Sequence, residues 1–171
     1  TQVLVAKTVV IVLLGAGIAL LSSFAAFFLT KILASNPPKP LVIETAEQWR
    51  FILGNAALYP IAGIIALAVG ALIRQSAGAI ALLLVWSMIV ESLIVFIPRW
   101  GADVSAWLPF TAGSAFTTDT SSFAAMGPDA GSAAQFLSPN APTPLQGLLV
   151  FVGTALVLWL IAAVVVNRRD A

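Results

Sequence analysis

The sequence contains neither cysteine nor histidine. Their absence excludes disulfides, thiol redox chemistry, thiolate or imidazole metal sites, and the Ser-His and Cys-His pairs of nucleophilic catalysis. Ser-Lys catalysis is disfavoured because Lys7, Lys31 and Lys39 lie at segment ends or in a loop. The acidic residues do not cluster into a carboxylate metal site, and no G-x-x-x-x-G-K-[ST] phosphate-binding loop is present. The residues therefore predict no enzyme, no catalytic set, and no cofactor or metal site within this chain.

Charge is also scarce. Only 9% of the 171 residues are charged and 60% are hydrophobic, whereas a soluble domain is about a quarter charged and about half apolar. Such a chain cannot cover itself with polar surface, so we expect lipid to be its main solvent. The formal net charge of +1 is too small to indicate a nucleic-acid partner or a polybasic membrane anchor.

Four long apolar runs, bounded by charges, account for most of the chain. At 1.5 Å rise per residue each run is roughly 33–36 Å long as a helix, enough to cross a hydrocarbon core of about 30 Å. The sequence therefore predicts an all-α integral membrane protein, a single transmembrane domain over residues 1–171. Its four predicted transmembrane helices span 8–30, 51–73, 75–97 and 145–166.

The loops suggest an orientation. The second and third spans are joined only by "RQS" at Arg74, which forces an antiparallel hairpin. Arg168 and Arg169 follow the last span directly. If these arginines face the cytoplasm, both termini are cytoplasmic and the loops 31–50 and 98–144 are outside, although the total of Lys and Arg is equal on the two sides. The outer loops hold nine of the ten prolines. We therefore expect a multi-pass membrane protein with both termini on the cytoplasmic side.

The outer loop 98–144 is too long to be an ordinary connection. Its first half, "PRWGADVSAWLPFTAGSAF", is apolar but broken by prolines and glycines, and it is too short to span. Irregular backbone at membrane depth must be buried in protein, so we predict a short re-entrant or interfacial helix pair here. The second half is polar and rich in Ala, Ser and Pro, as in an outer cap.

Glu91 is an acid inside the third apolar run. A charge at this depth costs on the order of 2–3 kcal/mol to insert, so its helix face should meet protein or water. In a regular α-helix Ser87 would share that face, while Trp86 would point the other way. We predict an intramembrane polar cluster at similar depth, containing Glu91, Ser87, Asn55, Tyr59, Ser22 and Ser23. Its role is either hydrogen-bonded packing between helices or a place on a transport path; as the only acid in the spans, Glu91 is a poor proton relay.

Small residues predict where helices approach each other. Gly63, Ala66 and Gly70 form a narrow stripe on the second span, which allows close helix packing. Pro60, in the same span, is expected to kink the helix or loosen one hydrogen bond.

The order of these features resembles a known family. The hairpin "ALYPIAGIIALAVGALIRQSAGAIALLLVW" is followed by "IVESLIVFIPRW", by "WLPFTAG", and by a last span ending "VVNRRDA". Together they resemble the carboxyl-terminal part of a bacterial type-2 ABC exporter permease, over most of residues 50–171 and more loosely over 1–34. In that family the permease has six spans, and re-entrant outer helices lie between spans five and six. The four runs would match spans three to six.

The resemblance implies a function. It predicts a permease subunit of an efflux system that exports a hydrophobic or amphipathic substrate, in contact with the lipid bilayer, a second permease and ABC ATPase subunits. ATP and Mg would bind only to that ATPase. Nothing here corresponds to the first two spans of the family or to its cytoplasmic docking helix, so the chain is expected to be a fragment, a shortened subunit or a different four-span protein. The alternative function is a structural or accessory subunit of a larger membrane complex.

Overall fold

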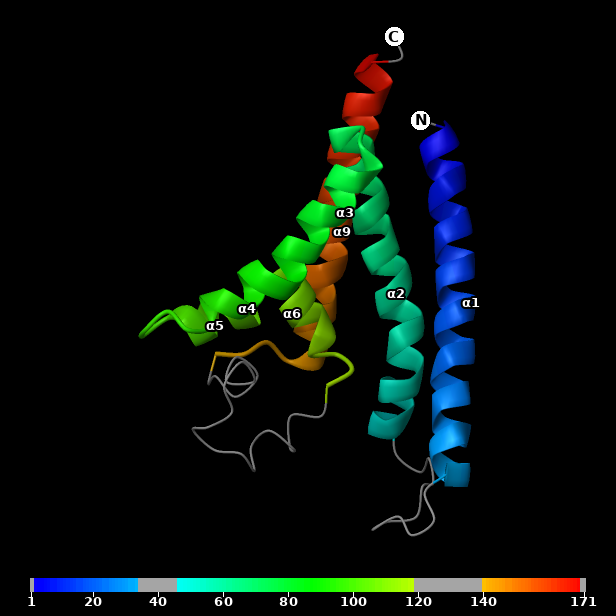
Figure 1. Ribbon diagram of the computed structural model, residues 1–171, viewed down its shortest axis with the longest axis vertical. Helices are drawn as coiled ribbons and strands as arrows, with labels where there is room; N and C mark the ends of the chain where they lie inside the picture. Colours follow the sequence, from blue (N-terminus) through cyan, green and yellow to red (C-terminus); the bar gives the residue numbers. More distant parts are fainter. Residues whose placement is uncertain (1, 34–45, 119–139, 170–171) are drawn as a thin grey trace.

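The computed structural model of the protein describes residues 2–33, 46–118 and 140–169 (Figure 1). These residues form helices and connecting turns, and no strand occurs among them. Four helices are long and apolar enough to cross a membrane, as the composition predicts. They are α1 (Gln2–Leu33), α2 (Ala46–Ile73), a third span over Ser76–Ile94, and α9 (Pro144–Arg169).

The helices are longer than the runs that the charges define, except in the third span. The α1 helix continues past Lys31, and α2 begins before Arg50. The third span instead ends at Ile94, three residues short of the predicted boundary at 97. Turns follow Ile94, and a short helix begins at Gly101.

The bundle has its core between α2, the third span and α9. Ile65 and Val69 of α2 pack there with Phe151 and Ala155 of α9 and with Ala79. The α1 helix lies along α2 on the outside of this core (Figure 1). The beginning of α1 and the end of α9 lie at the same end of the bundle. Because Leu13, Leu21 and Met88, among many others, remain more than half exposed, the apolar outer surface suits lipid, and the chain is a multi-pass membrane protein.

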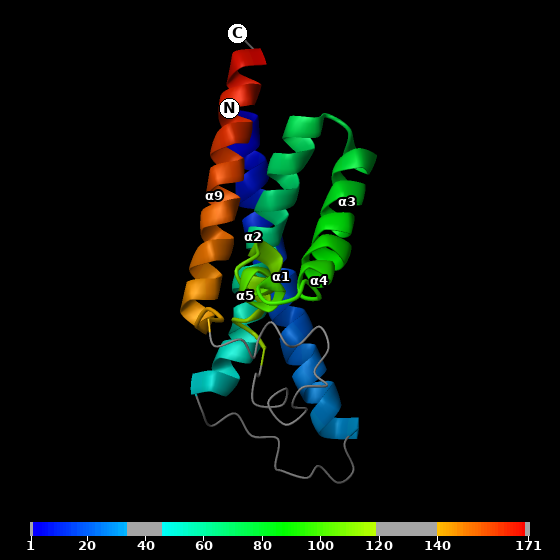
Figure 2. The ribbon, with the colours of Figure 1, turned by 90° about the vertical axis from the view of Figure 1, so that its left-hand side faces the viewer.

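The third span is not one regular helix. It consists of α3 (Ser76–Leu84), a π-helix η1 (Val85–Val90) and α4 (Glu91–Ile94). It is joined to α2 by a tight connection in which Arg74 has a φ of 58°. That left-handed conformation ends α2 and turns the chain back, so that the third span runs antiparallel to α2 (Figure 2).

The predicted pair of short helices is present between the last two spans. These helices are α5 (Gly101–Ala106) and α6 (Pro109–Ser114). Figure 1 shows α5 continuing away from the bundle beyond α4, and α6 lying beside α9. The predicted polar cap in the second half of the loop falls largely on 119–139, outside the described residues.

Candidate functional site

The carboxylate of Glu91 lies at the junction of the third span and α6. The side chain is 1% exposed. Its Oε2 atom accepts hydrogen bonds from the backbone N–H of Thr111, at 2.7 Å, and from the Thr111 hydroxyl, at 2.9 Å. Its Oε1 atom accepts from the backbone N–H of Phe110, at 3.2 Å, and from the indole N–H of Trp86, at 3.0 Å. The carboxylate thus accepts four hydrogen bonds, all from groups of the protein itself.

The α6 helix needs this acceptor because its own sequence supplies none. Leu108 occupies the N-cap position, and its own side chain makes no cap hydrogen bond. Pro109, at the first helical position, has no N–H, so Phe110 and Thr111 carry the first free amide donors. Unsatisfied amides at membrane depth are costly. Glu91 reaches across from another helix and serves as the cap, where its charge also suits the positive end of the helix dipole.

Trp86 lies on the same side as Glu91, and the expectation that it points away is wrong. The reason is the π-helix η1, in which the backbone N–H of Glu91 bonds to the carbonyl of Trp86, five residues earlier. This wider turn brings residues five apart onto one face. The indole N–H can therefore reach the carboxylate.

The α6 helix is pressed against α9. A methyl group added to Gly147 of α9 would collide with the carbonyl oxygen of Ala112 in α6. A Cβ on Gly113 would lie 2.8 Å from the Phe151 ring. The rings of Phe110 and Phe151 meet edge to face, with centroids 5.5 Å apart. The acid on one side and these close contacts on the other fix α6 between the last two spans.

The other residues of the predicted polar cluster form no hydrogen bond with Glu91. The Asn55 amide donates to the Ser23 hydroxyl at 3.2 Å, joining α2 to α1. Tyr59 is 59% exposed, Ser22 is exposed and Ser87 is half-buried. The four hydrogen bonds of Glu91 go to Trp86, Phe110 and Thr111, and none of them to these residues. Asn55 and Ser23 thus form one polar contact between α1 and α2, and Glu91 forms another between the third span and α6.

The predicted packing residues of α2 divide between two surroundings. Gly63 faces α1, where an added Cβ would lie 2.5 Å from Cγ2 of Ile11. Ala66 and Gly70 instead line a cleft. Pro60 lies buried within α2 and contacts α1, since a Cβ on Gly15 would lie 3.5 Å from Pro60. Whether Pro60 kinks the helix stays a prediction.

Two apolar cavities meet at Phe110, next to the Glu91 contacts. One, of about 370 Å³, lies between α2, the third span, α6 and α9, and Trp86 also lines it. The other, of about 240 Å³, lies on the Tyr59 side and is bounded by Phe151. The site therefore combines a carboxylate whose two oxygens already accept hydrogen bonds from the protein with cavities suited to hydrophobic groups. No group of three acidic side chains that could hold a metal ion occurs within the described ranges.

Comparison with protein-family models, with curated proteins and with solved structures gives no match for this chain.

Proposed function

We propose that this chain is a membrane-embedded permease subunit of an ABC exporter, or part of one, in the inner membrane of a bacterium. One observation carries the proposal: a short helix lies between the last two spans, with its first turn held by a buried acid of the third span. This arrangement agrees with the re-entrant outer helices that the resemblance implies. A four-helix bundle with no transport role would not require a short helix in this position.

The apolar cavities support a hydrophobic or amphipathic substrate. Each is bounded by α2, α6 and α9, with Phe110 shared between them. The path would open and close between this chain and a second permease, and a separate ATPase with its ATP and Mg would supply the energy. Both termini would then lie in the cytoplasm, where the ATPase binds.

The accessory role stays as the second candidate, favoured by the hydrogen bonding of Glu91. A carboxylate that accepts four protein donors has its acceptor positions directed into the protein, as expected of packing rather than substrate binding. A permease can also contain such a contact, so Glu91 does not distinguish the two candidate functions. The proteins that bind this chain do.

The test is purification of the tagged full-length protein from native membranes in a gentle detergent, with quantitative mass spectrometry of everything that remains bound. An ABC ATPase in near-equal amount, with ATP hydrolysis that stops when the phosphate-binding lysine of that ATPase is replaced, is the expected result. Membranes with untagged protein provide the control. Other membrane proteins at a fixed ratio without an ATPase would overturn the permease proposal in favour of the accessory role.

A further inference from the structure

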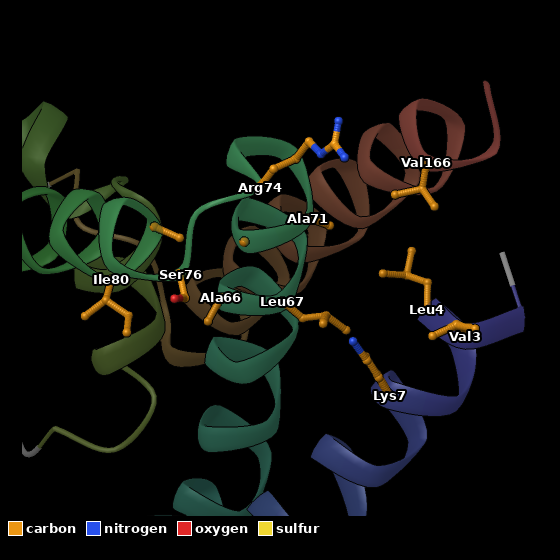
Figure 3. A pocket seen from close by; sticks show the side chains of 12 residues that line it. Val3, Leu4, Lys7, Ala66, Leu67, Ala71, Arg74, Ser76, Ile80 and Val166 are labelled. Carbon is orange, nitrogen blue, oxygen red and sulfur yellow. The ribbon is translucent and has the colours of Figure 1, made fainter. Parts of the chain in front are cut away.

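A third cavity, which Glu91 does not line, opens at the end of the bundle where α1 begins and α9 ends (Figure 3). It is a cleft of about 760 Å³ whose lining comes from α1, α2, the beginning of α3 and α9. Its walls are mostly apolar and include Leu4, Leu67, Ala71, Ile80 and Val166. The charged residues that line it are Lys7 and Arg74.

Both cations are available to a ligand. Their side chains are exposed, no acidic residue lines the cleft, and neither has an ion-pair partner within the described ranges. In Figure 3 the Lys7 side chain reaches from α1 toward Leu67 of α2, and Arg74 extends outward from the end of α2. The two positive charges therefore come from different helices that border one opening.

The positions of these residues in the sequence place the cleft relative to the bilayer. Lys7 directly precedes the uncharged run 8–30, and Arg74 directly follows the run 51–73. Cations at such boundaries lie at the depth of the lipid headgroups. The wall residues inward of these cations, such as Leu67 and Ile80, then lie at the depth of the acyl chains. A ligand for this cleft needs an anionic head and a long apolar tail.

We propose that the cleft binds an anionic phospholipid. The lipid phosphate lies between Lys7 and Arg74, and an acyl chain lies along Leu67 and Ile80. A free anion would leave the apolar walls uncovered. A zwitterionic lipid would bring its own cation to a rim that already carries two. Charge complementarity therefore selects a lipid with net negative charge.

The test is native mass spectrometry of the full-length protein, together with any subunits that co-purify. The protein is released from nanodiscs that contain equal amounts of phosphatidylglycerol and phosphatidylcholine with the same acyl chains. A Lys or Arg beside an anionic headgroup contributes a factor of about five in binding, so the two that line the cleft contribute about 25-fold. We expect that preference for phosphatidylglycerol in the wild type and its loss in the double variant Lys7→Gln/Arg74→Gln. Arg168→Gln, which removes a cation that does not line the cleft, should keep it.

A second variant tests the apolar part of the site. A Cβ on Gly70 meets no atom within 4 Å, so a side chain at this position has room to enter the cleft. Gly70→Leu should therefore lower the occupancy of both lipids, and thermal unfolding checks that the variant is folded. An unchanged preference in the double variant, or an equal loss in Arg168→Gln, would overturn the proposal. So would displacement of the lipid by soluble glycerol phosphate at equal concentration, which would indicate a free-anion site. Cross-linking of Ala71→Cys to a protein segment, in this otherwise cysteine-free chain, would show that protein fills the cleft.

Discussion

The Oε2 atom of Glu91 lies 2.7 Å from the backbone nitrogen of Thr111 and 2.9 Å from its hydroxyl oxygen. Both donors are buried with the acid: Glu91 is 1% and Thr111 is 7% exposed. The contact joins residues 20 apart in sequence, and it links the third span to α6, the second of the two short helices after it. The insertion cost of the carboxylate is therefore offset by hydrogen bonds that only the folded protein offers.

Glu91→Gln and Glu91→Leu should weaken this link to different extents. Glutamine keeps one acceptor oxygen, but its amide group faces two donors, which costs about 1–3 kcal/mol. Leucine leaves all four donors without an acceptor and should cost more. Thermal unfolding in detergent measures the global effect, and hydrogen exchange at the amides of Phe110 and Thr111 measures the local one. Unchanged exchange in Glu91→Leu would contradict the capping role.

Transport assays with the same two variants separate packing from a role on the substrate path. If Glu91 acts by packing, any loss of transport should follow the loss of folded protein and be smaller in Glu91→Gln. A fully folded Glu91→Gln protein that no longer transports would indicate that the acid acts on the path itself.

Thr111→Val should remove one of the two bonds to Oε2 and leave the shape of the side chain nearly unchanged. A hydrogen bond to a charged group contributes about 1.5–3 kcal/mol, so the unfolding temperature should fall. Thr111→Ser keeps the hydroxyl and is the matched control. A double-mutant cycle with Glu91→Gln should show a coupling above about 0.5 kcal/mol. Additive effects would mean that the two side chains do not stabilise each other.

Gly147→Ala should displace α6 from α9. The added methyl group meets the carbonyl oxygen of Ala112, a backbone atom that cannot rotate away, and overpacking of this kind costs about 1–3 kcal/mol. Gly153→Ala, on the same helix, is the control because its Cβ meets nothing within 4 Å. That control should be neutral, or stabilising by up to about 1 kcal/mol from helix propensity. Equal unfolding temperatures for the two variants would show that the close approach is not needed.

The four spans could be predicted because charge-free runs of this length have one stable arrangement in lipid. The helix pair α5 and α6 followed from the same constraint, since its segment is too apolar for water and too broken to span. The π-helix could not be predicted, because assigning faces to residues 75–97 assumed a regular α-helical repeat. The wider turn of the π-helix η1 places Trp86 on the same side of the span as Glu91.

The sequence contains a signal for the partners of Glu91, but matching residues by their depth in the membrane does not find it. "LPFT" places Pro109 at the start of a helix after Leu108, a residue that cannot cap. A helix that begins in this way at membrane depth needs an acceptor from elsewhere, and Glu91 is the only acid in the predicted spans. Matching an uncapped helix start with a buried acid would have found Thr111. Asn55 and Ser23, by contrast, form a hydrogen bond, as their similar depth in the membrane predicted.

The contact between α1 and α2 gives the last prediction, because two glycines of one helix differ only in what faces them. Gly63→Ala places a Cβ 2.5 Å from Cγ2 of Ile11, whereas Gly70→Ala places one in open space. Close approach at small residues holds transmembrane helices together by van der Waals contact. Gly63→Ala should therefore destabilise the α1–α2 pair by roughly 1 kcal/mol, less than Gly147→Ala, because a side chain yields more easily than a backbone carbonyl. Gly70→Ala should leave it intact.

A compensating change makes that prediction specific. Ile11→Ala removes the methyl group that Gly63→Ala would meet, so the double variant should be more stable than the sum of the two single changes predicts. Thermal unfolding of the four proteins in the same detergent provides the cycle. If Gly63→Ala and Gly70→Ala unfold at the same temperature, the α1–α2 contact does not depend on the glycine. If instead the cycle is additive, Gly63→Ala acts through something other than Ile11.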